Sequence, residues 1–113
     1  MRSFVILLAL LMPAAASAHA MLEHASPAVG STVGAAPKEI VLSFTEKLEP
    51  KFSSIDVRNA SGASVNSGRT NASGTEMRVG LKPLQPGTYK VIWRVLSVDT
   101  HRSNGSFTFR VGP

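Results

Sequence analysis

The sequence TYKVIWRVLSV, residues 88–98, has the most regular alternation in the chain. In an extended strand successive side chains point to opposite faces, so one face receives four apolar residues, Tyr89, Val91, Trp93 and Val95. The opposite face carries both basic and apolar side chains. The segment therefore predicts a long central β-strand, and Trp93 is expected to anchor a hydrophobic core.

The same period of two recurs elsewhere, separated by turns rich in Gly, Pro, Asn and Ser. Strands are predicted at residues 39–44, 52–58, 76–81 and 106–111, a weak one at 19–27 and a short one at 63–65. The rest of the Ser- and Asn-rich region 59–74 is expected to be polar loop, as is 102–105. No segment has helical periodicity. Short strands at this spacing predict an all-β fold, a seven-stranded Greek-key β-sandwich or barrel.

Residues 1–18 have the pattern of a secretory signal peptide. Arg2 precedes an apolar run at 4–12, which is too short to span a bilayer comfortably, and Ala16-Ser17-Ala18 forms a cleavage site. Cleavage after Ala18 would leave a single domain of residues 19–113. That domain would begin with His19.

Composition excludes several classes of protein. The absence of cysteine rules out a zinc ribbon, a thioredoxin-like enzyme and a thiolate copper protein. After Arg2 is removed with the leader, eleven Lys and Arg face seven Asp and Glu. These basic residues are scattered singly along the sequence. We therefore expect a solvated basic surface and no nucleic-acid binding.

Three histidines follow the leader, His19, His24 and His101. As the first residue, His19 would offer both its α-amine and its imidazole to a metal. Asp99 lies two residues before His101, so in an extended backbone both would point the same way. Three nitrogens and one oxygen suit Cu(II), and binding should release protons. From the residues alone, an Asp99–His101 hydrogen bond is the more ordinary interpretation of this spacing.

Several motifs together resemble the CopC family of periplasmic copper-binding proteins. They are His19-Ala20, Ser26-Pro27-Ala28, VLSFTE at 41–46, LQPGTYKVIWRV at 84–95, SVDTH at 97–101 and GSFTF at 105–109. The resemblance implies an exported, periplasmic β-barrel or sandwich of cupredoxin-like or Ig-like appearance. It also implies one Cu(II) per chain, held by the amine and imidazole of His19, by Asp99 and by His101.

The resemblance places Glu46 near the copper, as a weak extra ligand or a residue behind the ligands. It gives His24 no role, and we expect a surface histidine there. Some family members carry a second, Cu(I) site in a methionine-rich loop, but residues 59–74 contain no methionine. Of the two methionines after the leader, Met77 has a core position. The sequence thus favours a Cu(II)-only protein.

The expected function is a copper carrier or buffer in copper resistance or homeostasis. The resemblance suggests a CopD-type inner-membrane copper-transport protein as its partner. Two alternatives remain: a copper-dependent oxidative enzyme with an N-terminal histidine chelate, and a β-sandwich interaction module that binds no metal. The enzyme is disfavoured because the few aromatic residues alternate into the core, and because a carboxylate ligand should favour Cu(II). We therefore expect no enzymatic activity.

Overall fold

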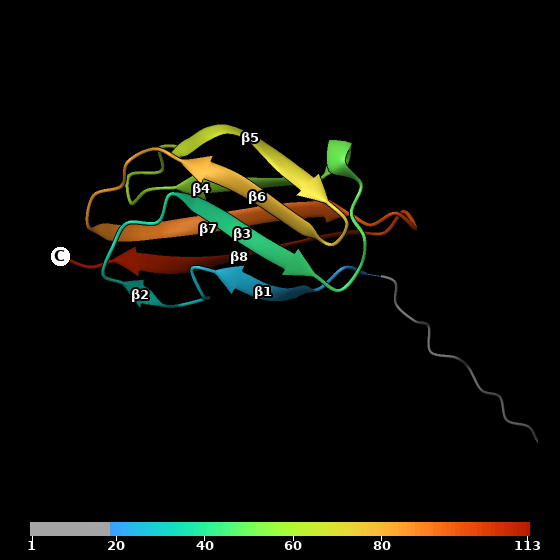
Figure 1. The fold of residues 1–113 in the computed structure, drawn as a ribbon, viewed down its shortest axis with the longest axis horizontal. Helices are drawn as coiled ribbons and strands as arrows, with labels where there is room; N and C mark the ends of the chain where they lie inside the picture. The colour runs from blue at the N-terminus through green and yellow to red at the C-terminus, as the bar shows by residue number, and fades with distance from the viewer. Residues whose placement is uncertain (1–18) are drawn as a thin grey trace, which may run out of the picture.

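The computed structural model describes residues 19–113, and the expected leader at 1–18 lies outside the described residues. The described chain forms two packed sheets, confirming the predicted all-β sandwich (Figure 1). Its elements are β1 (Leu22–Ser26), β2 (Thr32–Val33), β3 (Glu39–Phe44), the 3-10 turn η1 (Pro50–Phe52), β4 (Ser54–Arg58), β5 (Asn66–Ser73), β6 (Glu76–Leu81), β7 (Gly87–Leu96) and β8 (Arg102–Val111). Within this part of the chain, no helix is long and apolar enough to cross a membrane.

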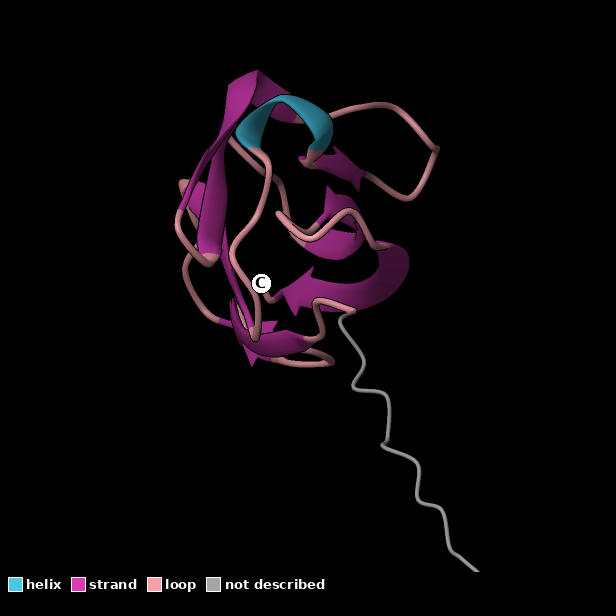
Figure 2. Ribbon diagram, turned by 90° about the vertical axis from the view of Figure 1, so that its right-hand side faces the viewer, coloured by secondary structure: helices cyan, strands magenta, loops and turns pink. Residues whose placement is uncertain are grey.

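One sheet has the strand order β1-β3-β6-β5 and the other the order β2-β8-β7-β4. All pairs are antiparallel except the short parallel pair β2–β8. The hairpins β5–β6 and β7–β8 each stay within one sheet, whereas every other connection crosses between the sheets. Viewed from the end that carries η1, the strands enclose a central core (Figure 2).

The core is built from the inward positions of both sheets, as the alternation predicts. Trp93 is 8% exposed and meets Phe44 of the other sheet edge to face, with ring centroids 5.1 Å apart. Gly105 lies opposite Trp93 in the β7–β8 ladder, and a Cβ there would come within 2.5 Å of the indole ring. Glycine at this position therefore makes room for the Trp93 ring.

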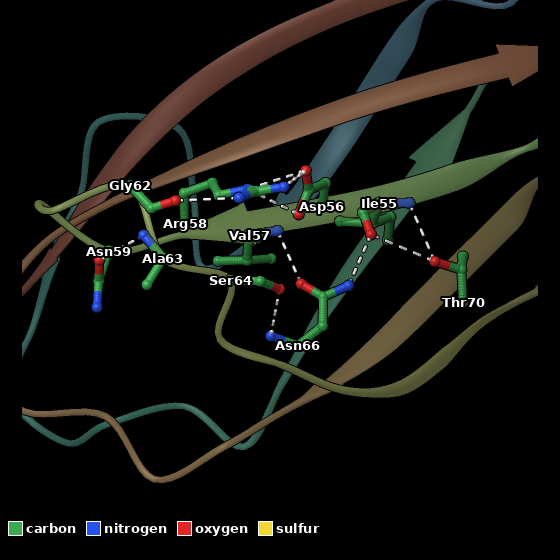
Figure 3. A network of polar contacts seen from close by, with 10 residues as sticks. All are labelled: Ile55, Asp56, Val57, Arg58, Asn59, Gly62, Ala63, Ser64, Asn66 and Thr70. Atoms are coloured by element: carbon green, nitrogen blue, oxygen red, sulfur yellow. Dashed lines mark hydrogen bonds and ion pairs between the residues drawn. The ribbon is translucent and has the colours of Figure 1, made fainter.

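The prediction of a polar loop after residue 65 is wrong, because residues 66–73 form the edge strand β5. Asn66 accepts a hydrogen bond from the N–H of Val57 (2.8 Å) and donates one to the carbonyl of Ile55 (2.9 Å), as Figure 3 shows. Thr70 Oγ1 accepts one from the N–H of Ile55 (3.0 Å). We call these contacts between β5 and β4 the seam. Polar side chains occur in this strand because they replace a backbone ladder between the two sheets.

The described part of the chain has eight strands, whereas seven were predicted. Residue 64 makes only an isolated bridge to Arg58, and two-residue β2 was not predicted. The expected loop at 102–105 is instead the start of β8, paired with β7 as far as Arg102 opposite Leu96. This segment has the polar composition of a loop because its outward residues, Arg102 and Asn104, are exposed to solvent. Of its inward residues, Ser103 donates to the carbonyl of Ala20, and Gly105 lies against the Trp93 ring.

Candidate metal centre

The segment before β1 is fixed at the end of the sandwich that carries η1 and the β7–β8 turn. Ser103 Oγ, at the start of β8, donates a 2.7 Å hydrogen bond to the carbonyl of Ala20. Met21 N–H donates to Thr45 Oγ1 (2.9 Å), and Thr45 N–H donates back to the carbonyl of Met21 (3.0 Å). Ala20 is fully buried beneath these contacts. Exposed His19 is therefore presented next to the β7–β8 turn.

Residues 97–101 form a tight turn, so the extended backbone under which Asp99 and His101 would share a face is not found. Thr100 has a φ of +74°, and the N–H of Ser97 donates to the carbonyl of His101 (2.9 Å). The chain must reverse here because β7 and β8 form one hairpin. The turn nevertheless brings the expected pair together, with His101 Nδ1 lying 3.4 Å from Asp99 Oδ1.

Ser97 contacts Asp99 of this pair from the buried side, and no role for Ser97 was predicted from the sequence. It is fully buried, and its hydroxyl donates a hydrogen bond to Asp99 Oδ1. That hydrogen bond lowers the pKa of the Asp99 carboxyl, with smaller contributions in the same direction from His101, while burial acts in the opposite direction. The sequence feature that could have indicated a structural role for Ser97 is its position two residues after Val95, which places it on the inward face just past the end of the central strand.

The rings of His19 and His101 lie beside one another, with centroids 5.3 Å apart and planes at 66°. The side chains of His101 and Asp99 are 50% and 46% exposed, so an ion in solvent can reach them. Among residues 19–113, no group of three or more His, Asp or Glu side chains forms a preassembled metal cage. The structure therefore brings together His19, Asp99 and His101 pairwise, at an exposed position that an ion can reach.

Glu46 and His24 are not joined to this group in the described chain. Glu46 is half-buried in the loop after β3, and no hydrogen bond or ion pair of its carboxylate is found within residues 19–113. His24 is exposed on β1, where it pairs through its backbone register with Ser43. A surface position for His24 is confirmed, whereas a role for Glu46 stays a prediction.

The two methionines within residues 19–113 differ in environment. Met77 is fully buried in the core, as predicted, whereas Met21 is 63% exposed beside the candidate site. One thioether at this end provides fewer soft donors than a methionine-rich loop.

The CopC domain family matches residues 22–112 of the chain. Copper resistance protein C of Pseudomonas syringae pv. tomato is 40% identical over 122 positions, covering 96% of this chain and 94% of that protein. CopC from Methylosinus trichosporium OB3b has a similar solved structure, with a TM-score of 0.79, 34% identity and coverage of 84% of this chain and 95% of that one. PcoC, a methionine-rich copper resistance protein from Escherichia coli, gives a TM-score of 0.72 and 36% identity, covering 83% and 99%.

Proposed function

Because this chain belongs to the CopC family of copper-binding resistance proteins, we propose that it carries or buffers Cu(II), one ion per chain. Family membership also agrees with the expectation that the protein is not an enzyme. The observation that carries the proposal is the pairing of His19 with His101, whose ring centroids lie 5.3 Å apart. Two residues separated by more than eighty positions meet at one exposed place.

The proposed ligands are the α-amine and imidazole of His19, an imidazole nitrogen of His101 and a carboxylate oxygen of Asp99. Asp99 Oδ1 already accepts the Ser97 hydroxyl and lies beside His101 Nδ1. We therefore assign Asp99 Oδ2 and His101 Nε2 to the ion. Three nitrogens and an anionic oxygen are donors that divalent copper prefers over softer Cu(I). The Ser97 hydrogen bond keeps Asp99 ionised and oriented, as partners behind metal ligands commonly do.

The α-amine becomes a donor only when the Ala18–His19 peptide bond has been cut. Copper binding would in this way be restricted to the exported protein, in the periplasm. The proposal that only Cu(II) is bound is supported by the scarcity of soft donors, since Met21 is the only exposed methionine among residues 19–113. A CopD-type inner-membrane transport protein remains the proposed partner, because a carrier needs a protein that receives or supplies its ion.

The test is a Cu(II) titration of residues 19–113, followed by the d–d absorption band and by EPR. The comparison is a variant with one alanine added before His19, which preserves every side chain but makes the nitrogen of His19 part of a peptide bond and moves the free amine one residue away. We expect one-to-one binding with nitrogen hyperfine structure in the first protein. In the extended variant, affinity should fall by at least about 100-fold, because it loses the chelate.

Two substitutions complete this experiment. His101→Ala should weaken binding as the extension does, whereas His24→Ala, which removes an exposed histidine outside the group, should leave binding unchanged. Equal binding by the extended variant, or greater loss in His24→Ala than in His101→Ala, would overturn the proposed ligand set.

A further inference from the structure

The outward face of sheet β2-β8-β7-β4 is strongly basic. Five cations occupy its outward positions, Arg58, Lys90, Arg94, Arg102 and Arg110, against one carboxylate, Asp56. Asp56 pairs with Arg58 at 2.9 Å, and none of the other four cations has an ion pair within residues 19–113. We call this surface the basic face.

The basic residues appear singly in the sequence and gather only through strand pairing. Arg94 lies opposite Asn104, and Leu96 opposite Arg102, in the β7–β8 ladder. The other sheet has no such excess, because two cations, Arg69 and Arg78, face three carboxylates, Glu23, Glu39 and Glu76. Arg78 pairs with both Glu39 (3.3 Å) and Glu76 (2.8 Å). The positive charge of the domain is thus concentrated on one side.

At the end near the candidate metal centre, the basic face continues into a groove of about 330 Å³. Lys51, Arg94 and Arg102 line it together with the hydroxyl-bearing Ser54. Phe52, also part of its wall, is 59% exposed. Cations and hydroxyls around such a groove suit an anionic phosphate, and an exposed aromatic ring suits the boundary between headgroups and acyl chains.

From these observations we infer that the basic face docks on an anionic lipid surface. The phosphates of lipid headgroups contact Lys90, Arg94 and Arg102, one headgroup enters the groove, and Phe52 inserts its ring at the membrane boundary.

A lipid surface fits this face better than a protein partner does. Arg102 and Arg110 lie eight residues apart on β8, so the cations extend over about 27 Å of a sheet, as a planar layer of phosphates requires. A protein interface would have buried aromatic or large apolar anchors near its centre. The outward apolar residues of these strands, Ile92 and Leu96, are only partly exposed. The exposed large apolar residues of the described chain lie on other segments, and they are Met21, Val29, Phe52 and Val98.

Docking in this way would hold the candidate metal centre at the margin of the contact. His101 directly precedes Arg102, so the site would lie close to the lipid surface while remaining open to the side. The inference does not require copper, and it can be tested on the metal-free protein.

The experiment uses metal-free residues 19–113, which contain every strand and the whole core, in sedimentation with two kinds of vesicle. One is pure phosphatidylcholine, and the other contains phosphatidylcholine and phosphatidylglycerol in equal parts. We expect binding only to the anionic vesicles, and its loss at about 1 M salt, where the Debye length is about 3 Å.

The decisive variant is Lys90→Glu/Arg94→Glu/Arg102→Glu, compared with Lys38→Glu/Arg69→Glu/Lys82→Glu. Both change the net charge equally, but the second set lies outside the basic face. The first should bind anionic vesicles at least about 100-fold more weakly, since each lost cation alone reduces binding roughly 5-fold. The second should retain most of the binding. Phe52→Ala should weaken binding moderately and leave its salt dependence unchanged.

Three outcomes would overturn the inference. They are equal binding to neutral and anionic vesicles, no binding to either, and equal losses in the two triple variants. Binding to an acidic protein without binding to vesicles would assign the face to a different partner. Far-ultraviolet circular dichroism checks that each variant folds, and the single variant Arg94→Glu provides the comparison if the triple variant does not.

Discussion

Besides the apolar core, polar side chains connect the two sheets in two places that differ in exposure and purpose. At the seam, Asn66 and Thr70 of β5 make part-buried hydrogen bonds of 2.8 to 3.0 Å with the backbone of β4. At the other place, the ring of His19 in the N-terminal segment lies beside the ring of His101, and His101 Nδ1 lies 3.4 Å from half-exposed Asp99. Polar groups that stabilise are paired and covered, whereas polar groups that bind a ligand remain partly unpaired and accessible. Substitutions should therefore separate stability from copper binding.

The largest effect is expected from Asn66→Ala. Removing this amide leaves the N–H of Val57 without a partner in a part-buried place, and the carbonyl of Ile55 keeps only the long 3.4 Å hydrogen bond from Thr70 Oγ1. The loss should destabilise the fold by about 2–3 kcal/mol. Urea unfolding measures this loss, and Cu(II) affinity below the transition should be unchanged. Asn71→Ala, an exposed change on the same strand, is the control and should cost less than about 0.5 kcal/mol. Similar losses in both variants would contradict the role given to the seam.

A smaller effect is expected from Ser103→Ala at the other junction. The variant loses the 2.7 Å hydrogen bond to the carbonyl of Ala20, so His19 is held less firmly beside His101. A loss of about 1 kcal/mol corresponds to roughly 5-fold weaker Cu(II) binding, measured by competition with a chromophoric chelator. Ser106→Ala, at an outward position of the same strand, should not change the affinity. If both variants bind copper as the parent does, the N-terminal segment needs no such anchor.

The smallest effect concerns pH and Asp99. Its folded-state pKa is lowered by the Ser97 hydroxyl, so its ionised form stabilises the fold above the ordinary value of 3.8, and this contribution is lost as the pH falls through the lower folded value. Asp99→Asn should therefore flatten the acid limb of stability slightly in thermal unfolding between about pH 5 and pH 2. Glu23→Gln, at an exposed position, should retain the parent profile. A steeper acid limb in Asp99→Asn would contradict the direction of the shift.

The core was predictable because its strands alternate simply. Residues 39–44 and 76–81 were bounded correctly, since apolar side chains there point into the core at every second position. Strand β5 was missed because its inward side chains make the hydrogen bonds of the seam, so apolar and polar residues do not alternate along it. Its polar composition is typical of a loop, and only the position of β4 beside it explains the sequence.

The candidate site was only partly accessible from the sequence. The types of donor atom made His19, Asp99 and His101 candidates for ligands. The backbone conformation between Asp99 and His101 could not be predicted, because the left-handed conformation at Thr100 depends on closing the β7–β8 hairpin. Ser97 and Ser103 were overlooked, since their roles depend on which residues they touch across the fold. The basic face was missed for the same reason, as cations that are isolated in sequence become neighbours only across paired strands.

The seam also determines what β4 can offer to other molecules. β4 pairs on one side with β7, and on its other side the N–H and C=O groups of Ile55 and Val57 are all occupied, three by Asn66 and Thr70 and the carbonyl of Val57 by the N–H of Val65. A strand from a second copy of the chain therefore finds no vacant ladder there, and β4 is protected from strand addition and self-association. The same side chains that join the sheets thus block strand addition at this edge.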